Sequence, residues 1–481
     1  MSQSRLASCI PLPIENKLLT NVVEKAKDWA LMHGVGMRDK VHFSKDSIQI
    51  APFVLLPSPF PRTEFTKAVD LQPVLNELMH KVAHDDEFLE KTLQNALQVD
   101  DFTAKLYDIW VKVREEGITQ ALSLGLFRSD YLMQQPDSNR IKQVEFNTVA
   151  ASFGAITSNL PTMYRYVMRQ LGHGELIKNM PENKALSGLC SGIIEAYDLF
   201  AVPSAVVLFV VEEVSYNICD QRFHEFEISE KRPDIMIYRK TLNEIFEEAE
   251  LNDKKQLIIE GQPVAVVYYR SGYEPAQYPS QKEWDARLRV ERSSAIKCPS
   301  IHYQLAGTKK VQQALAAPGA LEKFMSESEV SSRVRDIFTG LYSLDFDENG
   351  ERAVEMAIAD AERFVLKPQR EGGGNNLYGA DVKEALIRMR HSRERAAYIL
   401  MERILPPLIS GYVVRAGGSM PPTLCDLVSE LGIFGVIIGT KEKIHSNRQV
   451  GHMLRTKLAD ANEGGVAAGL GALDSPYLLD L

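Results

Sequence analysis

Residues 364–379 read Phe-Val-Leu-Lys-Pro-Gln-Arg-Glu-Gly-Gly-Gly-Asn-Asn-Leu-Tyr-Gly, an apolar start that runs directly into a lysine, an arginine, a glutamate and three glycines. Lys367 can neutralise phosphate oxygens, and Glu371 can hold a Mg²⁺ ion that bridges them. Gly372, Gly373 and Gly374 let backbone N–H groups approach phosphates because no Cβ stands in the way. The stretch therefore predicts a strand that leads into a triphosphate-binding loop.

A plain glycine turn between two strands, with solvated lysine and arginine side chains, is the alternative interpretation of this stretch. Hairpin turns need only one or two glycines, so three in a row favour the phosphate site. The stretch matches neither Gly-x-x-x-x-Gly-Lys-Ser/Thr nor Gly-x-Gly-x-x-Gly, two common phosphate-binding patterns. We therefore expect a triphosphate site of another type.

The composition is that of an ordinary globular protein. The chain has 481 residues, a net charge of −9 and 45% apolar residues, which suits two or three domains or one large composite domain. Because no basic stripe with interleaved aromatic residues is present, nucleic acid is not expected as a partner. The most apolar stretch, residues 205–211, is too short to span a membrane, so no membrane partner is expected.

The cysteines and the N-terminal residues bear on the compartment. The chain contains five cysteines, Cys9, Cys190, Cys219, Cys298 and Cys425. Their odd number and wide spacing argue against a disulfide framework or a structural zinc site and favour a reducing compartment. No apolar segment of a secretory signal is present, so a cytoplasmic protein is expected. The N-terminal residues contain serine and no acidic residue before Glu15, so a plastid form with a trimmed transit peptide is the alternative.

Apolar periodicity predicts an α/β (α+β) protein. Helices are expected at residues 14–30, 71–97, 185–199, 284–294, 309–317 and 383–395, and strands at 141–147, 205–211, 263–270, 364–366, 398–401, 412–415 and 433–438. Residues 51–61 are expected to form a proline-rich extended loop, and the charged segment 225–255 mostly helix. The apolar, β-branched runs at 205–211 and 263–270 are typical of buried parallel strands. We therefore expect three parts: residues 1–205, a small α/β domain at 206–306, and residues 307–481.

Glu145 and Asn147 form the first candidate metal-binding pair. On a strand, residues i and i+2 face the same side, so a carboxylate and an amide oxygen would point together. Oxygen ligands of this kind suit Mg²⁺, and Glu371 offers a third. A solvent-facing polar pair on a half-exposed strand is the alternative for Glu145 and Asn147 alone.

Several charged residues are weaker candidates. Lys309 follows Gly307-Thr308 at a predicted helix start, which attracts anions, although helix capping alone explains the threonine. Arg128, Arg455 and Lys457 can clamp a carboxylate or a phosphoryl group, or form surface ion pairs. Around Glu402, backbone groups can read an adenine edge, and Glu430 can accept ribose hydroxyls. His452 is expected to be a hydrogen-bonded structural histidine.

The motifs occur together in one order along the chain: Arg128 with Asp130-Tyr131, then residues 144–148, 151–154, 304–313, 366–379, 429–435, 451–457 and 464–469. Taken together, they resemble the eukaryotic-type glutathione synthetases, which are ATP-grasp carboxylate–amine ligases. The resemblance extends from about residue 14 to the C-terminus. Its most specific segment is Lys-Pro-Gln-Arg-Glu-Gly-Gly-Gly-Asn-Asn at residues 367–376.

The resemblance implies a circularly permuted ATP-grasp fold with an inserted substrate-binding domain, and a homodimer. It implies that the enzyme joins γ-glutamylcysteine to glycine while ATP becomes ADP and phosphate, through an acyl phosphate. Mg²⁺ would be held by Glu145, Asn147 and Glu371. The residues implied for ATP are Glu145, Lys309, Lys367, Pro368, Gln369, Arg370, Glu371, Gly372, Gly373, Gly374, Asn375, Asn376, Tyr378, Met401, Glu402, Arg403, Ile404, Glu430, Lys457 and Glu463. Those implied for substrate are Arg128, Ser152, Asn217, Gln221, Arg270, Tyr273, Arg455, Val466 and Ala467, with Arg128 and Arg455 also catalytic.

Two departures from the family pattern concern the substrate. The family usually has Glu-Arg-Asn where this chain has Ser215-Tyr216-Asn217, so one carboxylate expected near the dipeptide is missing. Ala150 replaces a common serine, which removes a hydroxyl.

Several rival functions stand beside this expectation. The same ligase with β-alanine as acceptor is one, but family members that use β-alanine have Leu-Pro where this chain has Ala467-Ala468. A ligase with a different first substrate, a small-molecule kinase and an ATP-binding protein without ligase activity are the others.

Overall fold

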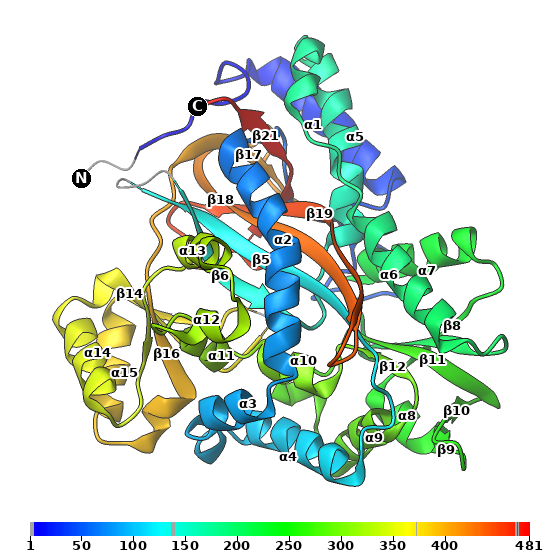
Figure 1. Cartoon of the computed structure of the whole chain (residues 1–481). Coiled ribbons are helices and arrows are strands. Elements are labelled where there is room, and N and C mark those ends of the chain that lie inside the picture. The colour runs from blue at the N-terminus through cyan, green and yellow to red at the C-terminus, as the bar shows by residue number, and fades with distance from the viewer. Residues whose placement is uncertain (1–3, 136–139, 372, 467–468, 470) are drawn as a thin grey trace.

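The computed structural model describes residues 4–135, 140–371, 373–466, 469 and 471–481. It is a mixed α/β structure with a 13-stranded sheet, a separate four-stranded sheet and two short two-stranded pairings. Figure 1 shows the long strands at the centre and the four-stranded sheet in its own lobe beside them. The predicted fold class is therefore correct at the level of a mixed α/β protein. Within the described ranges, no helix combines the length and apolar character needed to cross a membrane.

Four long antiparallel strands form the centre of the large sheet. They are β5 (Ser123–Gln134), β6 (Arg140–Asn147), β18 (Leu424–Gly439) and β19 (Ile444–Leu458). β18 lies between β5 and β19, and β6 pairs with the other edge of β5. The sequence predicted β6 and the end of β18, but it did not predict β5 or β19. Their polar residues interrupt the apolar alternation on the side that forms the cavity described below.

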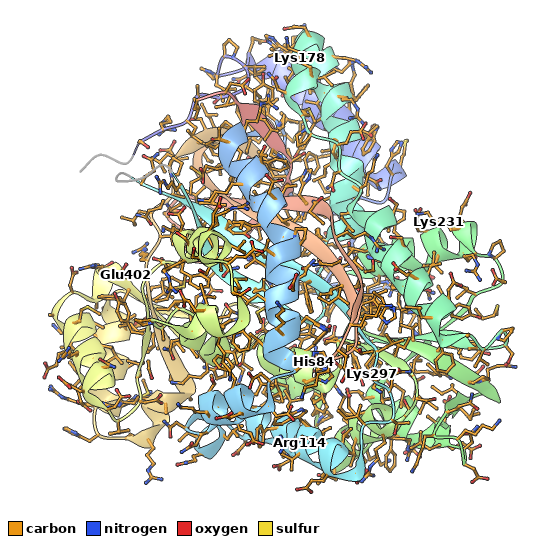
Figure 2. All side chains as sticks on the ribbon, viewed as in Figure 1. His84, Arg114, Lys178, Lys231, Lys297 and Glu402 are labelled. Carbon is orange, nitrogen blue, oxygen red and sulfur yellow. The ribbon has the colours of Figure 1, made fainter. Side chains whose placement is uncertain are left out.

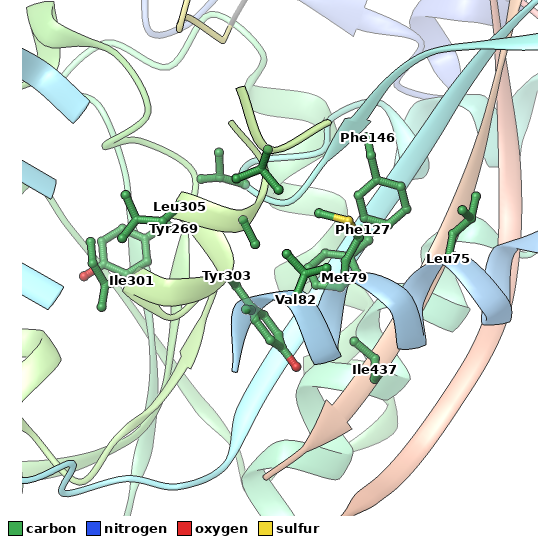
Figure 3. Packing of buried hydrophobic residues seen from close by; sticks show 14 of the residues in the cluster. Leu75, Met79, Val82, Phe127, Phe146, Tyr269, Ile301, Tyr303, Leu305 and Ile437 are labelled. Atoms are coloured by element: carbon green, nitrogen blue, oxygen red, sulfur yellow. The ribbon is translucent and has the colours of Figure 1, made fainter. Parts of the chain in front are cut away.

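The two faces of β18 pack against different helices. Leu431, Ile433 and Ile437 lie in one buried cluster with the side chains of α2 (Arg62–Ala83). Phe434 and Val436 point the other way, into a cluster with α1 (Asn16–Met32), α5 (Gly154–Gln170) and α6 (Ala185–Phe200), because strand side chains alternate between faces. Figure 3 shows the first cluster, with α2 side chains packed on the long strands.

The close approach of α2 to the sheet depends on a glycine. A Cβ on Gly435 would lie only 2.3 Å from Asn76 Oδ1 on α2, so any other residue there would displace the Asn76 side chain or the helix. Asn76 in turn donates to Asn447 Oδ1 across 3.0 Å. The C-terminal end of α2 is capped by His84, which Figure 2 labels at the lower end of the helix.

The parallel part of the large sheet comes from residues 206–298. It contains β7 (Val206–Val210), β8 (Met236–Lys240), β11 (Gln262–Tyr269) and β12 (Ile296–Cys298), all paired in parallel, with β9 (Glu250–Leu251) and β10 (Leu257–Ile259) antiparallel at the edge. The predicted buried parallel strands at 205–211 and 263–270 are confirmed. The prediction that 225–255 is mostly helix is wrong over β8 and β9. β8 is a five-residue edge strand with no buried face, so no period of two marks it in the sequence. β12 joins this part to β5 through Lys297 and Ser123, and the division at residues 206 and 306 stays a prediction.

The remaining helices surround these strands. They are α3 (Asp86–Leu93), α4 (Asp101–Glu116), α7 (Ile218–Lys231), α8 (Leu242–Glu248), α9 (Gln281–Arg292), α10 (Ile301–Ala306), α11 (Lys309–Leu315), α12 (Ala320–Phe324) and α13 (Ser328–Ile337), with short 3₁₀ turns at 96–98, 174–179, 275–277, 361–363 and 393–397. The helices predicted at 14–30, 185–199, 284–294 and 309–317 are confirmed with shifted ends. The helix predicted at 71–97 is two helices, because α2 begins at Arg62 and ends before Asp85, which caps α3.

The four-stranded sheet has its own small core. Its strands run in the order β13 (Leu341–Ser343), β16 (Tyr398–Glu402), β14 (Phe364–Pro368) and β15 (Leu377–Tyr378). α14 (Glu348–Ala359) and α15 (Ala380–Met389) cover it with buried residues such as Val354 and Leu386. The strands predicted at 364–366 and 398–401 are confirmed here, and α15 with the following 3₁₀ turn accounts for the helical segment predicted at 383–395.

Short strands complete the chain. They are β1 (Gly36–Met37), β2 (Gln49–Ile50), β3 (Phe53–Val54), β4 (Ser58–Pro61), β17 (Ile409–Val414), β20 (Gly471–Asp474) and β21 (Pro476–Leu479). The segment 51–61 was predicted to be an extended loop, but β3 and β4 lie within it. β4 pairs in parallel with β21, so a C-terminal strand satisfies backbone groups that the local sequence leaves free.

Candidate active site

A cavity of about 330 Å³ lies between the long central strands and the four-stranded sheet. Its walls come from β5, β6, β14, β16, β18 and β19, from the glycine-rich loop and from residues 459–466. Nineteen of the predicted site residues line it: Arg128, Glu145, Asn147, Ser152, Tyr273, Lys367, Glu371, Gly373, Asn376, Tyr378, Met401, Glu402, Arg403, Ile404, Glu430, Arg455, Lys457, Glu463 and Val466.

Lys309 links two carboxylates at this cavity. Its Nζ lies 3.2 Å from Glu145 Oε2 and 2.9 Å from Glu371 Oε1, although the three residues are far apart in sequence. Burial alone would lower the pKa of Lys309, but the two glutamates raise it above its usual range. Burial would likewise raise the pKa of Glu145, but Lys309, Lys367 and Arg455 hold it below its usual range. Burial raises the pKa of Glu371 despite Lys309.

Asp130 organises the neighbouring polar groups. Its two carboxylate oxygens accept from Arg128 Nε and Nη2 at 2.6 and 2.7 Å, and Oδ2 accepts from Asn147 Nδ2 at 3.0 Å. Because the amide nitrogen of Asn147 is engaged in this way, its oxygen is directed away from Asp130. The carboxylate and guanidinium fit on the strand because Gly432 lies opposite, where a Cβ would be 2.8 Å from Asp130 Oδ1.

Arg455 and Glu430 are cross-strand partners on β19 and β18. Both Nε and Nη2 of Arg455 donate to Glu430 Oε1, the former at 3.2 Å, and Nη2 also lies 3.6 Å from Asp130 Oδ2. Burial would lower the pKa of Arg455, but Glu430 and Asp130 raise it. Burial raises the pKa of Glu430 against the effect of Arg455. Glu430, predicted to accept ribose hydroxyls, is therefore ion-paired in this structure.

Lys367 reaches the cavity from β14. The side chain is 4% exposed, and its Nζ donates to the carbonyl of Val144 at 2.9 Å. Burial lowers the pKa of Lys367, with partial compensation by Glu145. The ammonium of Lys367 thus has one neutral hydrogen-bond partner at the cavity wall and further donors that a phosphate could use.

The glycine-rich loop presents backbone donors to an anion. Gly373 and Gly374 have φ values of +74° and +80°, a conformation that favours glycine. The N–H groups of Gly374 and Asn376 both donate to the carboxylate of Glu463, the latter at 3.1 Å. A carboxylate therefore binds in a nest of amides of the kind that binds phosphate. Gly372 lies outside the described residues.

The far wall of the cavity includes Met401, Arg403, Ile404 and Tyr378. Glu402 lies at the end of β16, where its Oε1 accepts from Arg363 Nη2 at 2.9 Å and from the Tyr342 hydroxyl at 3.1 Å. Figure 2 labels this residue on the lobe formed by the four-stranded sheet. Apolar lining residues such as Met401 and Ile404, with polar groups beside them, are typical of a site for a planar ring.

Ser152 and Arg270 meet at the opposite end of the cavity. Arg270 Nη2 donates to Ser152 Oγ at 2.7 Å, and Nη1 donates to the carbonyl of Ala151 at 3.3 Å. Asp220 lies 3.5 Å from the same guanidinium and accepts from the backbone N–H groups of Phe153 and Ala155. This end of the cavity is therefore polar and rigidly held.

The other predicted residues lie around the cavity without lining it. Pro368, Gln369, Gly374 and Asn375 belong to the loop, Arg270 backs Ser152, Asn217 caps α7, Gln221 Oε1 accepts from Arg239 Nη2 at 2.8 Å, and Arg370 points away to Asp100. Ala467 lies outside the described residues. The sequence assigned no role to Asp130, although its spacing of two from Arg128 on a strand places both on one side.

His452 differs from its prediction. It is buried, but its Nε2 has no hydrogen-bond partner among the described residues, and its ring packs edge-on against Phe65 at 5.2 Å. Burial lowers the pKa of His452 to about 3, so the neutral ring is a packing residue.

Comparison with known proteins identifies the family. The family model for the eukaryotic glutathione synthase ATP-binding domain matches residues 16–478. The chain belongs to the eukaryotic glutathione synthase family. Glutathione synthetase from Xenopus laevis is 44% identical over 469 residues, which cover 97% of this chain and 98% of the relative. The human enzyme is 43% identical over 467 residues, covering 96% and 98%.

Two further relatives complete the comparison with the glutathione synthase family. The glutathione synthetase named as chloroplastic from Arabidopsis thaliana is 38% identical over 475 residues, covering 97% of this chain and 86% of the relative. The structure of a glutathione synthetase-like effector from Globodera pallida superimposes with a TM-score of 0.79 at 26% identity, covering 98% of this chain and 100% of the effector.

The segment that departs from the glutathione synthase pattern is folded against the N-terminal region. Ser215 Oγ accepts from Arg239 Nη2 at 3.3 Å, and Tyr216 packs edge-on against Phe43. Lys40 Nζ lies 5.4 Å from the centre of the Tyr216 ring. Arg239 also pairs with Glu225, with its Nη1 at 2.6 Å from Glu225 Oε1.

Proposed function

We propose that the cavity binds ATP, Mg²⁺, γ-glutamylcysteine and glycine, and that its residues carry out the ATP-dependent synthesis of glutathione. The reaction itself follows from membership of the glutathione synthase family, and the rival functions are not favoured. The observation that carries the residue assignments is the convergence of Lys367, Arg455, Glu145 and Glu371 at one cavity. Lys309 does not line this cavity itself, but it is paired with both glutamates.

The residues present fit Mg²⁺. Glu145 and Glu371 already share one cation, the Lys309 ammonium, so their oxygens are close enough to act on a common charge. Asn147, held by Asp130, supplies an amide oxygen beside them. Carboxylate and amide oxygens are ligands that Mg²⁺ prefers, with phosphate oxygens and water completing the shell. Among the described residues no group of three or more His, Cys, Asp or Glu side chains is placed to hold a metal.

The bound ion would neutralise charge on the phosphate oxygens. In the reaction we propose, a cysteinyl carboxylate oxygen attacks the γ-phosphorus, the bond to the β-phosphate oxygen breaks, and ADP leaves. The glycine amine then attacks the acyl carbon, phosphate leaves and the nitrogen loses a proton. Lys309 and Lys367 would neutralise the transferring phosphoryl group, and Arg128 and Arg455 would hold the carboxylate and the acyl phosphate.

The chain itself would contribute mainly positioning and exclusion of water. Aligned reactants can lower a barrier by about 7–11 kcal/mol. An acyl phosphate hydrolyses readily, so the reaction needs loops that close over the site. The glycine-rich loop and the segment with Gly464, Gly465 and Val466 already meet through Glu463, and we assign the closing role to this pair of loops.

We further propose that the chain has an ATP-grasp fold with circularly permuted elements. The support is the position of the cavity between two sheets, with Lys367 and Met401 on one and Glu145 and Glu430 on the other. The part at 206–306 would bind the dipeptide through Arg270 and Tyr273, with residues 1–205 and 307–481 forming the ATP-grasp body.

We also propose a homodimer and a cytoplasmic location. Large apolar side chains are exposed on α1 and on the loop between β1 and β2, namely Leu31, Met32, Val41, Phe43 and Ile48. Met32 and Val41 are each 81% exposed, and a second copy is the occupant we assign to this surface. Light scattering of wild type and Val41→Asp tests the dimer, and a monomeric wild-type protein would refute it.

The cysteines support the proposed cytoplasmic location. All five carry free thiols, as a reducing cytoplasm would maintain them.

ADP release tests the function. The assay contains ATP, Mg²⁺ and γ-glutamylcysteine, with glycine or β-alanine added in parallel, and we expect turnover that requires glycine. Glu371→Gln should lose ATP turnover while keeping its melting temperature within a few degrees. A Glu371→Gln variant with near-normal turnover would remove Glu371 from the metal site, and turnover without an amine would point to a kinase.

A further inference from the structure

Arg370 belongs to the phosphate-loop motif, yet its side chain lies outside the cavity. It contributes to a second hollow formed by the start of α4 and by Pro275, Tyr278 and Trp284. There its Nη1 lies 2.7 Å from Asp100 Oδ1. A residue of the motif is thus attached to the start of a helix outside the cavity.

Asp100 is buried and held in place by a second contact. The residue is 3% exposed and stands immediately before α4, and its other carboxylate oxygen accepts from the Thr103 hydroxyl. The Arg370 guanidinium also donates to the carbonyl of Gln369 at 2.6 Å. A buried carboxylate whose partner is removed is strongly destabilised, so this pair resists separation.

The residues on either side of Arg370 are attached to a different helix. Gln369 Oε1 accepts from the backbone N–H of Lys310 at 2.9 Å, and Glu371 Oε1 accepts from Lys309 Nζ at 2.9 Å. Both lysines begin α11. Three consecutive residues are therefore attached alternately to α11 and α4, so that the backbone between them has little freedom to shift.

We propose that Asp100 is a positioning residue for the reaction: through Arg370 it fixes the backbone that carries Glu371. The inference rests on the proposed function, in which Glu371 holds Mg²⁺. Without Asp100, Glu371 keeps its Lys309 contact but loses the restraint on its other side. A misplaced Glu371 carboxylate should weaken the binding of MgATP. It should affect the dipeptide less, because we assign the dipeptide to the opposite end of the cavity.

The test compares Asp100→Asn with Thr103→Val. Both changes weaken a contact of the Asp100 side chain: Asp100→Asn removes the charge that pairs with Arg370, and Thr103→Val removes the hydroxyl that donates to the other oxygen. We expect Asp100→Asn to raise the KM for ATP and the Mg²⁺ concentration for half-maximal activity by about 10- to 100-fold, as for loss of a hydrogen bond to a charged group. Thr103→Val should lower thermal stability similarly and leave both values within about twofold of wild type. The KM for γ-glutamylcysteine should change little in either variant.

Two further measurements distinguish a positioning role of Asp100 from a general loss of stability. Calorimetric binding of Mn²⁺ in the presence of ADP should weaken in Asp100→Asn and not in Thr103→Val, without any need for turnover. Arg370→Met should have the same effect as Asp100→Asn, and the double variant should be no worse than either single one, because the two residues act through one contact. If Asp100→Asn does not fold, Arg370→Lys, which keeps the charge and loses the fork, takes its place.

Unchanged KM for ATP and unchanged Mn²⁺ affinity in Asp100→Asn, or in Arg370→Lys as its substitute, would overturn the proposal. Additive losses in the double variant would also overturn it. These outcomes differ from failure of the proposed function, since Glu371→Gln would then still abolish turnover.

Discussion

Replacing Lys309 by methionine removes the cation that joins Glu145 to Glu371. The Lys309 side chain is 5% exposed, and its Nζ lies 2.9 Å from Glu371 Oε1 and 3.2 Å from Glu145 Oε2. Methionine keeps the volume and apolar stem of the lysine, so the perturbation is mainly one of charge. We expect a loss of catalysis and of stability that have different causes.

The size of each loss follows from the contacts. Removing one preorganised charge that stabilises a transition state lowers the rate by about 10²–10³-fold, so kcat/KM for ATP should fall by this factor. Breaking a buried ion pair costs about 3–5 kcal/mol, and because both glutamates keep about a fifth of their side-chain exposure we expect the lower end, about 3 kcal/mol.

The loss of stability should depend on pH. Lys309 is the largest of the charges that hold the pKa of Glu145 below its usual range, and a depressed carboxyl pKa stabilises the fold above the unfolded pKa. That stabilisation disappears as the pH falls and the carboxyl becomes protonated. The difference in unfolding free energy between wild type and Lys309→Met should therefore be fully present near pH 7 and shrink as the pH falls below the unfolded glutamate pKa of about 4.3.

Lys310→Met is the matched control. Lys310 is the next residue, is 3% exposed, and pairs with Asp345 at 2.6 Å, away from the cavity. We expect denaturant unfolding to show a similar loss of stability for this variant, and ADP-release kinetics to show a change of only a few fold. Equal losses of kcat/KM in both variants, or wild-type kinetics in Lys309→Met, would refute the assignment of Lys309 to the phosphates.

Further expectations concern Arg455, Glu371 and the acceptor loop. Arg455→Ala should lower kcat/KM at least about 100-fold and Arg455→Lys less, because one ammonium cannot replace the guanidinium fork; unchanged steady-state kinetics would make Arg455 a structural residue. Burial raises the pKa of Glu371, and the ionised form is the one that would hold the metal. Activity should therefore fall with decreasing pH at a point above the ordinary glutamate value of about 4.3 in a pH profile of kcat/KM, and an acid limb at or below that value would contradict this. Ala467→Leu combined with Ala468→Pro should shift the ratio of β-alanine to glycine turnover toward β-alanine, and an unchanged ratio would show that these two residues do not select the acceptor.

The sequence alone was sufficient for the family, the reaction and much of the local structure. The stretch from Lys367 to Asn376 and the motifs around it are patterns of residue type and spacing, which can be recognised from the sequence alone. The apolar periods at 185–199, 205–211 and 263–270 gave α6, β7 and β11, because helices and buried strands are fixed largely by neighbouring residues. The period of two also brought Glu145 and Asn147 to one side of β6.

Only the tertiary structure decided which of these residues meet and which way each one points. Within one motif, Glu371 faces Lys309 and Arg370 faces Asp100, and the motif itself does not distinguish them. The pairing of Glu430 with Arg455 depends on the register between β18 and β19, which no local period specifies. Strands β5 and β19 were not predicted for the same reason. Their polar side chains line a cavity that they form together with distant strands, and the local sequence does not show this. The sequence determined the chemical groups, and long-range packing determined their partners, since side-chain direction and charge pairing depend on contacts between residues far apart in the chain.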